Sequence, residues 1–365
     1  MKKMIRTVAA AAAVLMAPPA LADDDAEETD GAKPLIALEL ELGFGTDWTF
    51  KADDRTAELA DAYPDIALAV TINATDWLAF NLGVAVESVL DPVGDRFFGD
   101  IGAYVDTLNA QVFLGGLTVT AGKFAPGFGT AWDVTPGVYG TDFAGDYELS
   151  EALGLGLAYE FKAGAAGTIT AGANLFYADN TVLSESVFTN RGRNRVGAGG
   201  PGNTGKLNNF SVTLDGSDIP AVEGLTWHLG YAHLQRGRGD ISDVNAFALG
   251  LAYERETGSG WTVGWNGEVV YATGWNGARD KAVYVTQGLS FAKDSWHAEL
   301  AGTIRQVRYF AGGRDNDLLA QVSAGYEFEN GVDVSLGYAF AREAREEAHT
   351  LGLSITKTFE YEVAR

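Results

Sequence analysis

Apolar and polar residues alternate along most of this chain with the period of two that a β-strand imposes. In Leu35–Phe50, for example, large apolar residues at every second position alternate with glutamate and small residues. The pattern predicts sixteen strands: Leu35–Phe50, Asp65–Ile72, Trp77–Glu87, Ala103–Leu114, Leu117–Ala121, Ala152–Phe161, Thr168–Tyr177, Leu207–Leu214, Leu225–Gln235, Val244–Glu254, Trp261–Tyr271, Ala282–Phe291, Trp296–Val307, Leu318–Phe328, Val332–Phe340 and His349–Phe359.

This set of strands predicts an all-β fold, a closed antiparallel transmembrane barrel. A barrel of sixteen strands is too wide for side chains to fill, so its apolar face must point outward into lipid. Short connections alternate with longer polar ones, as expected when one end is periplasmic and the other extracellular. Aromatic residues beside the short turns fit an interfacial girdle: Trp77, Tyr159, Phe161, Tyr253, Trp261, Phe291, Trp296, Tyr326, Phe328 and Phe359.

One long stretch, Gly122–Ser150, interrupts the alternation between two predicted strands. It is rich in glycine and aromatic residues and contains Pro126 and Pro136. Its aromatic content argues against disorder, and a long ordered loop is usually functional. We therefore expect the third long loop to fold into the barrel and to form its narrowest point. The candidates for lining this constriction are Asp133, Asp142, Asp146 and Glu148 on the loop and Arg305 on the wall.

The N-terminus has the features of a secretory signal peptide. Residues 1–22 contain the basic residues Lys2, Lys3 and Arg6, an apolar core and the A-x-A motif ending at Ala22. The alternative is an N-terminal anchor helix. Removal of this segment leaves 23 Lys and Arg against 49 Asp and Glu, a formal charge of −26, which argues against a nucleic-acid partner.

Residues 23–34 form an acidic leader before the barrel, which we assign to residues 35–365. We expect the leader to be solvated, with binding of a divalent cation such as calcium at acidic loops as the alternative. No other cofactor is expected. The four histidines are scattered and the chain contains no cysteine, so neither a catalytic pair nor a transition-metal site is expected. The chain is not predicted to be an enzyme.

Charges in lumen phase are mostly acidic and predict a cation-preferring interior. The carboxylates are Glu39, Glu41, Asp65, Glu87, Glu160, Glu268, Glu299, Glu327 and Asp333. Arg305 is the only basic residue that the alternation places in the lumen. Arg191, Arg193 and Arg195 fall in a long polar segment, where we expect a solvated patch or, alternatively, recruitment of an anionic solute.

The chain resembles the sixteen-stranded outer-membrane porins of Gram-negative bacteria over essentially its whole mature length. The string Gly122–Gly129 (GKFAPGFG) is also similar to one in phosphate-selective and related substrate-specific porins. The resemblance implies a homotrimer, surrounded by outer-membrane lipid and lipopolysaccharide, that passes small hydrophilic solutes and ions. It implies that the acidic third loop faces basic wall residues. Strands of this family usually end the chain with an aromatic residue, whereas here Glu360–Arg365 follows the last predicted strand.

Two classes of function follow from these observations. One is a passive channel for small hydrophilic solutes. The other is a binding protein, either a channel with a saturable solute site or a barrel that acts as an adhesin through its loops.

Overall fold

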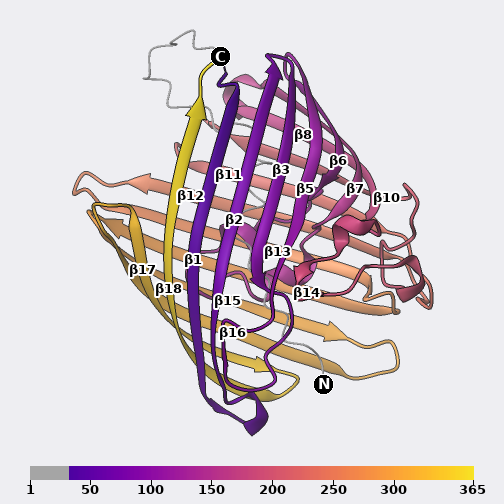
Figure 1. Ribbon diagram of the computed structural model, residues 1–365, viewed down its shortest axis with the longest axis vertical. Helices are drawn as coiled ribbons and strands as arrows, with labels where there is room; N and C mark the ends of the chain where they lie inside the picture. The colour runs from indigo at the N-terminus through magenta and orange to yellow at the C-terminus, as the bar shows by residue number, and fades with distance from the viewer. Residues whose placement is uncertain (1–32) are drawn as a thin grey trace.

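The computed structural model describes residues 33–365 and shows one closed antiparallel barrel (Figure 1). The predicted signal peptide and nearly all of the acidic leader lie outside these residues. The sixteen wall strands are β1 (Ile36–Ala52), β2 (Ala60–Thr75), β3 (Leu78–Ser88), β5 (Ile101–Leu114), β6 (Leu117–Phe124), β7 (Ala152–Lys162), β8 (Thr168–Ala178), β10 (Asn209–Ser217), β11 (Leu225–Leu234), β12 (Val244–Glu256), β13 (Thr262–Trp275), β14 (Asp280–Lys293), β15 (Trp296–Arg308), β16 (Arg314–Glu327), β17 (Val332–Glu343) and β18 (Glu346–Val363).

Consecutive wall strands pair with each other, and β1 pairs with β18 to close the barrel. Every wall strand therefore has a partner on both sides, which removes the free edges that lipid cannot satisfy. The predicted all-β barrel of sixteen strands is thus confirmed. The helical elements are short: α1 (Ala131–Val134), η1 (Arg55–Ala57), η2 (Ala144–Tyr147), η3 (Gly164–Ala166), η4 (Val182–Ser184) and η5 (Val196–Ala198). Within the described residues, no helix is long and apolar enough to cross a membrane.

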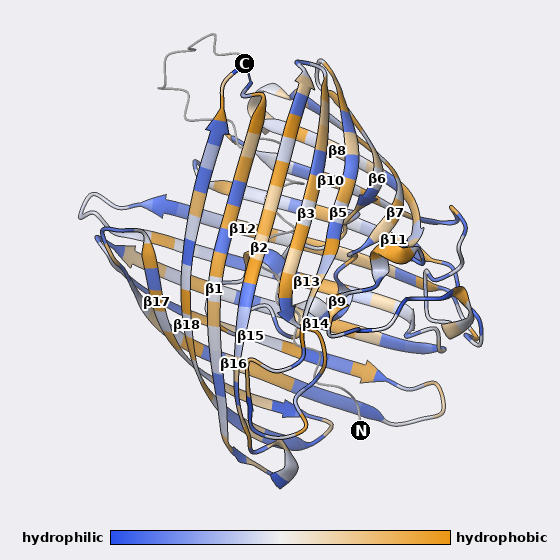
Figure 2. Ribbon diagram, in the orientation of Figure 1, coloured by the Kyte–Doolittle hydropathy of each residue, from blue (hydrophilic) through white to orange (hydrophobic). Residues whose placement is uncertain are grey.

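The outer surface of the barrel carries the apolar residues of the alternation, and Figure 2 shows the resulting alternate bands along the strands. Leu336 on β17 is 64% exposed, whereas its neighbour Ser335 is buried on the lumen side. Aromatic rings at the short turns touch one another on the outside, as between Trp296 and Tyr326, whose centroids are 4.8 Å apart. These contacts agree with an interfacial girdle.

Several strands run further toward the long-loop end than the sequence pattern predicted. The connection expected at Ala341–Ala348 shrinks to Ala344 and Arg345, both with positive φ, between β17 and β18. The connection expected at Ala272–Lys281 shrinks to residues 276–279. The apolar alternation ends where the wall emerges from lipid, but the backbone hydrogen bonds between strands continue beyond it. At the other end, β18 continues past Phe359 to Val363 and exposes Tyr361.

The chain leaves the wall at Phe124, where β6 ends, and this departure uncovers part of β5. A two-residue strand, β9 (Val187–Phe188), pairs with Gly102 and Ala103 of β5 in that gap. A second short strand, β4 (Arg96–Phe97), pairs with β2 beyond the end of β3. The long loops therefore complete the sheet where wall strands stop short.

A charge on the outer face should be costly in the middle of the wall and cheap beside a turn. Leu336→Arg should lower the free energy of unfolding in lipid vesicles by about 2–4 kcal/mol. The matched control is Leu114→Arg, because Leu114 is similarly exposed at 58% but precedes the Gly115-Gly116 turn, where about 0–1 kcal/mol is expected. Equal costs at the two sites, measured by denaturant titration, would contradict the assigned membrane band.

Candidate functional site

Residues 125–151, which we call the lumen loop, connect β6 to β7 through the interior of the barrel. The loop crosses to the wall opposite its origin, where it packs against β11–β14. This confirms the prediction that the third long loop folds into the lumen. The loop rests on alanines of β11–β14 and buries Phe128 and Tyr147, which are 2% and 4% exposed. Each buried aromatic side chain stabilises this position by roughly 1.5–3 kcal/mol.

Glu268 on β13 holds the first part of the loop. Its carboxylate accepts hydrogen bonds from the Thr130 backbone N–H at 2.7 Å, the Ala131 N–H at 3.2 Å and the Tyr147 hydroxyl at 2.6 Å. Thr130 is the N-cap of the single turn α1 and Ala131 is its first residue, so their backbone N–H groups have no partner within the turn. A wall carboxylate therefore satisfies these donors and ties the outgoing part of the loop to the returning one.

Arg305 on β15 holds the returning part. Its guanidinium donates to Asp146 of the loop at 2.7 Å and to Asp317 of the wall at 2.9 Å, and it also pairs with Glu343. The guanidinium lies 4.5 Å from the centroid of the Phe143 ring. The expected approach of Arg305 and Asp146 is therefore present. Since three carboxylates surround this cation, its charge is already compensated.

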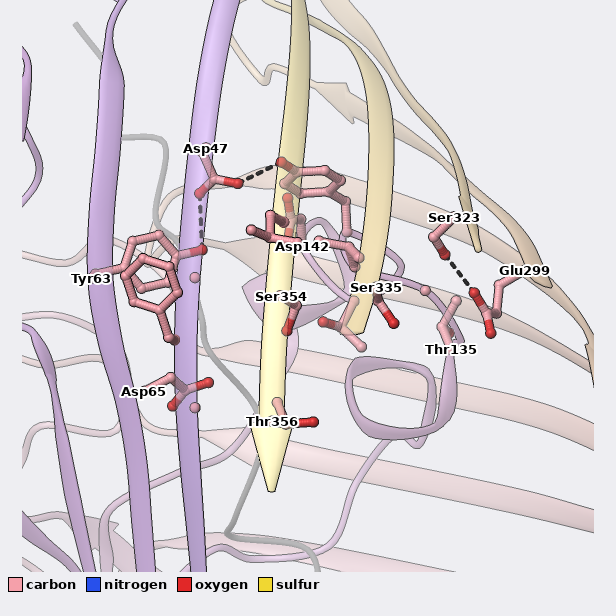
Figure 3. A pocket seen from close by; sticks show the side chains of 18 of the residues that line it. Asp47, Tyr63, Asp65, Thr135, Asp142, Glu299, Ser323, Ser335, Ser354 and Thr356 are labelled. Atoms are coloured by element: carbon pink, nitrogen blue, oxygen red, sulfur yellow. Dashed lines mark hydrogen bonds between the residues drawn. The ribbon is translucent and has the colours of Figure 1, made fainter. Parts of the chain in front are cut away.

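Asp47 on β1 holds the tip of the loop. The Tyr139 hydroxyl donates to Asp47 Oδ1 at 2.5 Å, and the Tyr63 hydroxyl of the neighbouring strand donates to Oδ2 at 2.9 Å (Figure 3). Asp47 is 1% exposed, so this charge-assisted pair is shielded from bulk water. The loop is thereby fixed at its start, its tip and its return.

Glycines of the opposite wall make room for the loop. A Cβ atom at Gly230 would lie 2.1 Å from the Phe128 carbonyl oxygen, and one at Gly352 would lie 2.1 Å from the Tyr139 hydroxyl. A Cβ at Gly288 would lie 2.4 Å from the Pro136 ring. Gly154, Gly156 and Gly172 on the strands that follow the loop face neighbouring wall strands instead, because the loop crosses the lumen before it packs.

Carboxylates line a cavity of about 360 Å³ between the loop and β1–β2, which we call the acidic cavity (Figure 3). Its wall also includes hydroxyl, aromatic and glycine positions together with His297, Val138 and Leu353, and no lysine or arginine is among the lining residues. The lining carboxylates are Glu41, Asp47, Asp65, Asp133, Asp142 and Glu299. This cavity brings together two loop residues and three wall residues that the sequence singled out separately.

The remaining predicted constriction residues lie apart from this cavity lining. Asp146 is bound by Arg305 and by the Tyr284 hydroxyl at 2.7 Å. Glu148 is partly buried on the loop. Burial, followed by the carboxylates of Asp133, Glu151 and Glu87, raises the pKa of Glu148 to about 7. Its charge therefore appears as the pH rises through neutrality.

Among the predicted lumen charges, several face each other across paired strands. Asp65 on β2 is directly opposite Glu87 on β3, and Glu39 on β1 is directly opposite Glu360 on β18. Like charges in these positions repel, which a water-filled lumen containing cations would relieve. Two of the lumen carboxylates accept from hydroxyl groups: the Tyr104 hydroxyl donates to Glu87 at 2.6 Å, and the Ser323 hydroxyl donates to Glu299 at 2.6 Å.

His297 is one of the lining residues of the acidic cavity and lies between two carboxylates. Its ring nitrogens are 2.5 Å from Glu299 and 2.7 Å from Asp333. His228 contacts the Phe128 carbonyl oxygen of the loop and lies 2.6 Å from Asp215. Across residues 33–365, no three His, Asp or Glu side chains form an arrangement that could hold a metal ion.

Lys123 is a buried cation near the start of the lumen loop that the sequence analysis missed. The predicted strand ended at Ala121, but Gly122, with a φ of 135°, carries β6 on to Phe124. Lys123 is fully buried and lies 2.7 Å from Glu151 and 2.9 Å from Asp179. Lys123 pairs across the sheet with the outward-facing Leu108, so it leaves the expectation about Arg305 in the lumen phase unchanged.

The arginines of the fourth long loop divide into two kinds. Arg191 donates to Glu151 at 2.6 Å and lies 3.6 Å from the Tyr104 ring centroid, so it joins the Lys123 network. The expected solvated patch was therefore wrong for Arg191, because its guanidinium pairs with Glu151 where the lumen loop returns to the wall. Arg193 and Arg195 are exposed.

No protein-family profile matches the chain, and no curated protein matches it. Solved structures share its fold. OprB of Pseudomonas putida has a TM-score of 0.62 at 12% identity, covering 89% of this chain and 94% of its own. The outer-membrane channel DcaP of Acinetobacter baumannii has a TM-score of 0.61 at 10% identity, covering 91% and 98%. OccK1 (OpdK) of Pseudomonas aeruginosa has a TM-score of 0.54 at 12% identity, covering 91% and 100%.

These similarities, together with the closed wall and the exposed apolar band, define the class. The chain shares the closed-barrel fold of these outer-membrane channels.

Glu268→Gln should loosen the lumen loop without breaking the wall. An amide cannot accept at both former oxygen positions, and a hydrogen bond to a charged group is worth about 1.5–3 kcal/mol. We expect faster amide exchange in residues 128–148 and more current noise in single-channel recordings. Glu254→Gln, an exposed carboxylate on the adjacent strand β12, is the control. Unchanged exchange in the Glu268 variant would show that packing alone holds the loop.

Proposed function

We propose that the protein is an outer-membrane porin for passive diffusion of small hydrophilic solutes and ions, with a preference for cations. The observation that carries this proposal is the acidic cavity beside the lumen loop, whose lining includes six carboxylates and no lysine or arginine. The lumen loop narrows the path at this level. Solutes that pass it must come close to Asp133 and Asp142.

The compensation of the cations near the lumen loop supports the same conclusion. Arg305 is surrounded by Asp146, Asp317 and Glu343, and Lys123 by Glu151 and Asp179. These cations therefore contribute little positive potential to the open path. The carboxylates of the cavity keep a negative field that raises the local concentration of cations.

A channel with a saturable solute site is the second candidate. OpdK, which has the same fold, was crystallised with vanillate, a carboxylate. In this chain the exposed Arg193 and Arg195 are the arginines that could meet an anionic solute before it enters. Conductance that saturates as one solute is added would favour a specific site, whereas a linear response would favour the general pore.

The orientation of the barrel, the lipid around it and its oligomeric state are assigned as follows. We place the termini and short turns in the periplasm and the long loops outside the cell, with residues 1–22 removed on export. Outer-membrane lipid and lipopolysaccharide cover the exposed apolar band, and three copies form a homotrimer. Mass photometry of the purified protein in detergent tests the trimer.

Neutralising three carboxylates of the lumen loop should reduce the preference for cations. In a triple variant, Asp133→Asn, Asp142→Asn and Glu148→Gln, the reversal potential in a potassium chloride gradient should move toward zero. Acidification from pH 8 to pH 6 should act in the same direction on the native protein, because the pKa of Glu148 is about 7. The native preference should also weaken in salt, since the Debye length falls from about 10 Å at 0.1 M to about 3 Å at 1 M.

The matched control removes three exposed carboxylates at the short turns: Glu223→Gln, Glu256→Gln and Glu329→Gln. It changes the net charge equally and should leave the reversal potential nearly unchanged. Anion preference in the native protein would contradict the proposal and favour the anionic-solute alternative.

Shortening the lumen loop should widen the channel. Deletion of Thr135–Phe143 removes the tip that Asp47 holds and the ring beside Arg305, so single-channel conductance and the size of admitted solutes should rise. Tyr139→Phe, which removes one hydroxyl but leaves the loop length intact, is the control. A folded deletion variant with unchanged conductance would place the constriction elsewhere.

A further inference from the structure

Three basic residues lie side by side on the outer surface of the barrel, at the long-loop end of three consecutive strands. Lys281 is the second residue of β14, Arg308 is the last of β15 and Arg314 is the first of β16. Lys281 is directly opposite Arg308, and Arg308 is directly opposite Arg314. All three are exposed, and the alternation of each strand turns them away from the lumen. We call these residues the basic row.

The arrangement is unfavourable unless something compensates it, because like charges directly opposite on paired strands destabilise a sheet. In the described part of the chain, no carboxylate lies within 4.0 Å of the basic row. The acidic neighbours are engaged elsewhere: Asp280 accepts from the Phe310 N–H at 2.8 Å, and Asp315 accepts from the Tyr309 hydroxyl at 2.5 Å. Three neighbouring cations without a carboxylate partner are unusual in a chain that has far more carboxylates than cations.

The position of the basic row relative to the apolar band indicates what covers it. Ile304 on β15 is 54% exposed on the same outward face. Two residues further along, Gln306 donates to Asn316 at 2.7 Å, and Arg308 and Arg314 follow. The outer face thus changes from apolar to polar to basic within a few residues. A lipid leaflet changes in the same order, from acyl chains in its interior to charged headgroups at its surface.

We propose that the basic row binds the phosphate groups of an anionic lipid in the outer leaflet. Guanidinium groups donate two parallel hydrogen bonds to phosphate, and an ammonium group adds a mobile point charge. Neighbouring strands are about 5 Å apart, so the three cations span roughly 10 Å and can meet more than one phosphate. The assignment rests on the proposed orientation, with long loops outside, and is independent of ion selectivity in the lumen.

The test compares two lipids that differ only in phosphate. Delipidated protein in neutral detergent is titrated with bis-phosphorylated lipid A and with the same lipid A lacking both phosphates, and bound lipid is counted by native mass spectrometry. The native protein should prefer the phosphorylated form by roughly tenfold or more, since one charge-assisted hydrogen bond is worth about that factor. The triple variant Lys281→Gln, Arg308→Gln and Arg314→Gln should bind both forms equally.

The matched control, Lys162→Gln, Arg255→Gln and Lys293→Gln, removes three cations at the short-turn end and should keep the native preference. If the triple variant does not fold, Arg314→Gln alone should lower the preference several-fold. A preference that survives in the folded variants would overturn the proposal, as would displacement of lipid A by an equal concentration of inorganic phosphate. Reversal potentials should be the same in the native protein and the triple variant, which separates this result from failure of the proposed channel function.

Discussion

The structure depends on one constraint: lipid cannot hydrogen-bond the backbone, so the sheet must close on itself. Closure with sixteen strands sends the apolar face outward and leaves an interior that wall side chains cannot fill. The lumen loop fills part of it, and it can do so only by bringing polar groups that match those of the wall. Glu268, Arg305 and Asp47 each meet loop atoms directly. Ionic and charge-assisted contacts thus take the role that an apolar core has in a soluble barrel.

The departure of the lumen loop has a structural cost at its origin. Because the chain turns inward after Phe124, part of β5 has no pairing with β6, and buried charged groups lie where the loop leaves the wall. The fourth long loop compensates on both counts, because β9 pairs with β5 and Arg191 joins Lys123 on Glu151. A loop that the sequence indicated as a solvated patch is therefore partly a wall element. Changes in this loop are expected to act on the lumen loop through Glu151.

Much of the fold could be predicted from the sequence because the barrel wall obeys a local rule. Alternation with a period of two identified all sixteen strands, and the aromatic loop between two of them indicated a lumen segment. Strand ends were less predictable, since β17 and β18 continue through residues whose polarity reflects water rather than a turn. The partners of the loop could not be predicted, because Glu268 and Gly352 become its neighbours only after closure. Lys123 was missed because the alternation breaks at Gly122, which has a positive φ, so the sequence pattern did not include the last residues of β6.

The distribution of charge connects the wall, the lumen and the membrane. Lys123 and Arg305 are bound by carboxylates that hold loops, whereas Glu41, Asp65 and the loop carboxylates Asp133 and Asp142 line the acidic cavity. Their repulsion across paired strands costs stability, and mobile cations in the water of the lumen screen it. Repulsion within the basic row on the outer face calls for the opposite counterion. On the proposal above, anionic headgroups supply it on the outer face while cations in the water of the lumen screen the inner carboxylates, so that each face of the barrel is compensated by the phase it touches.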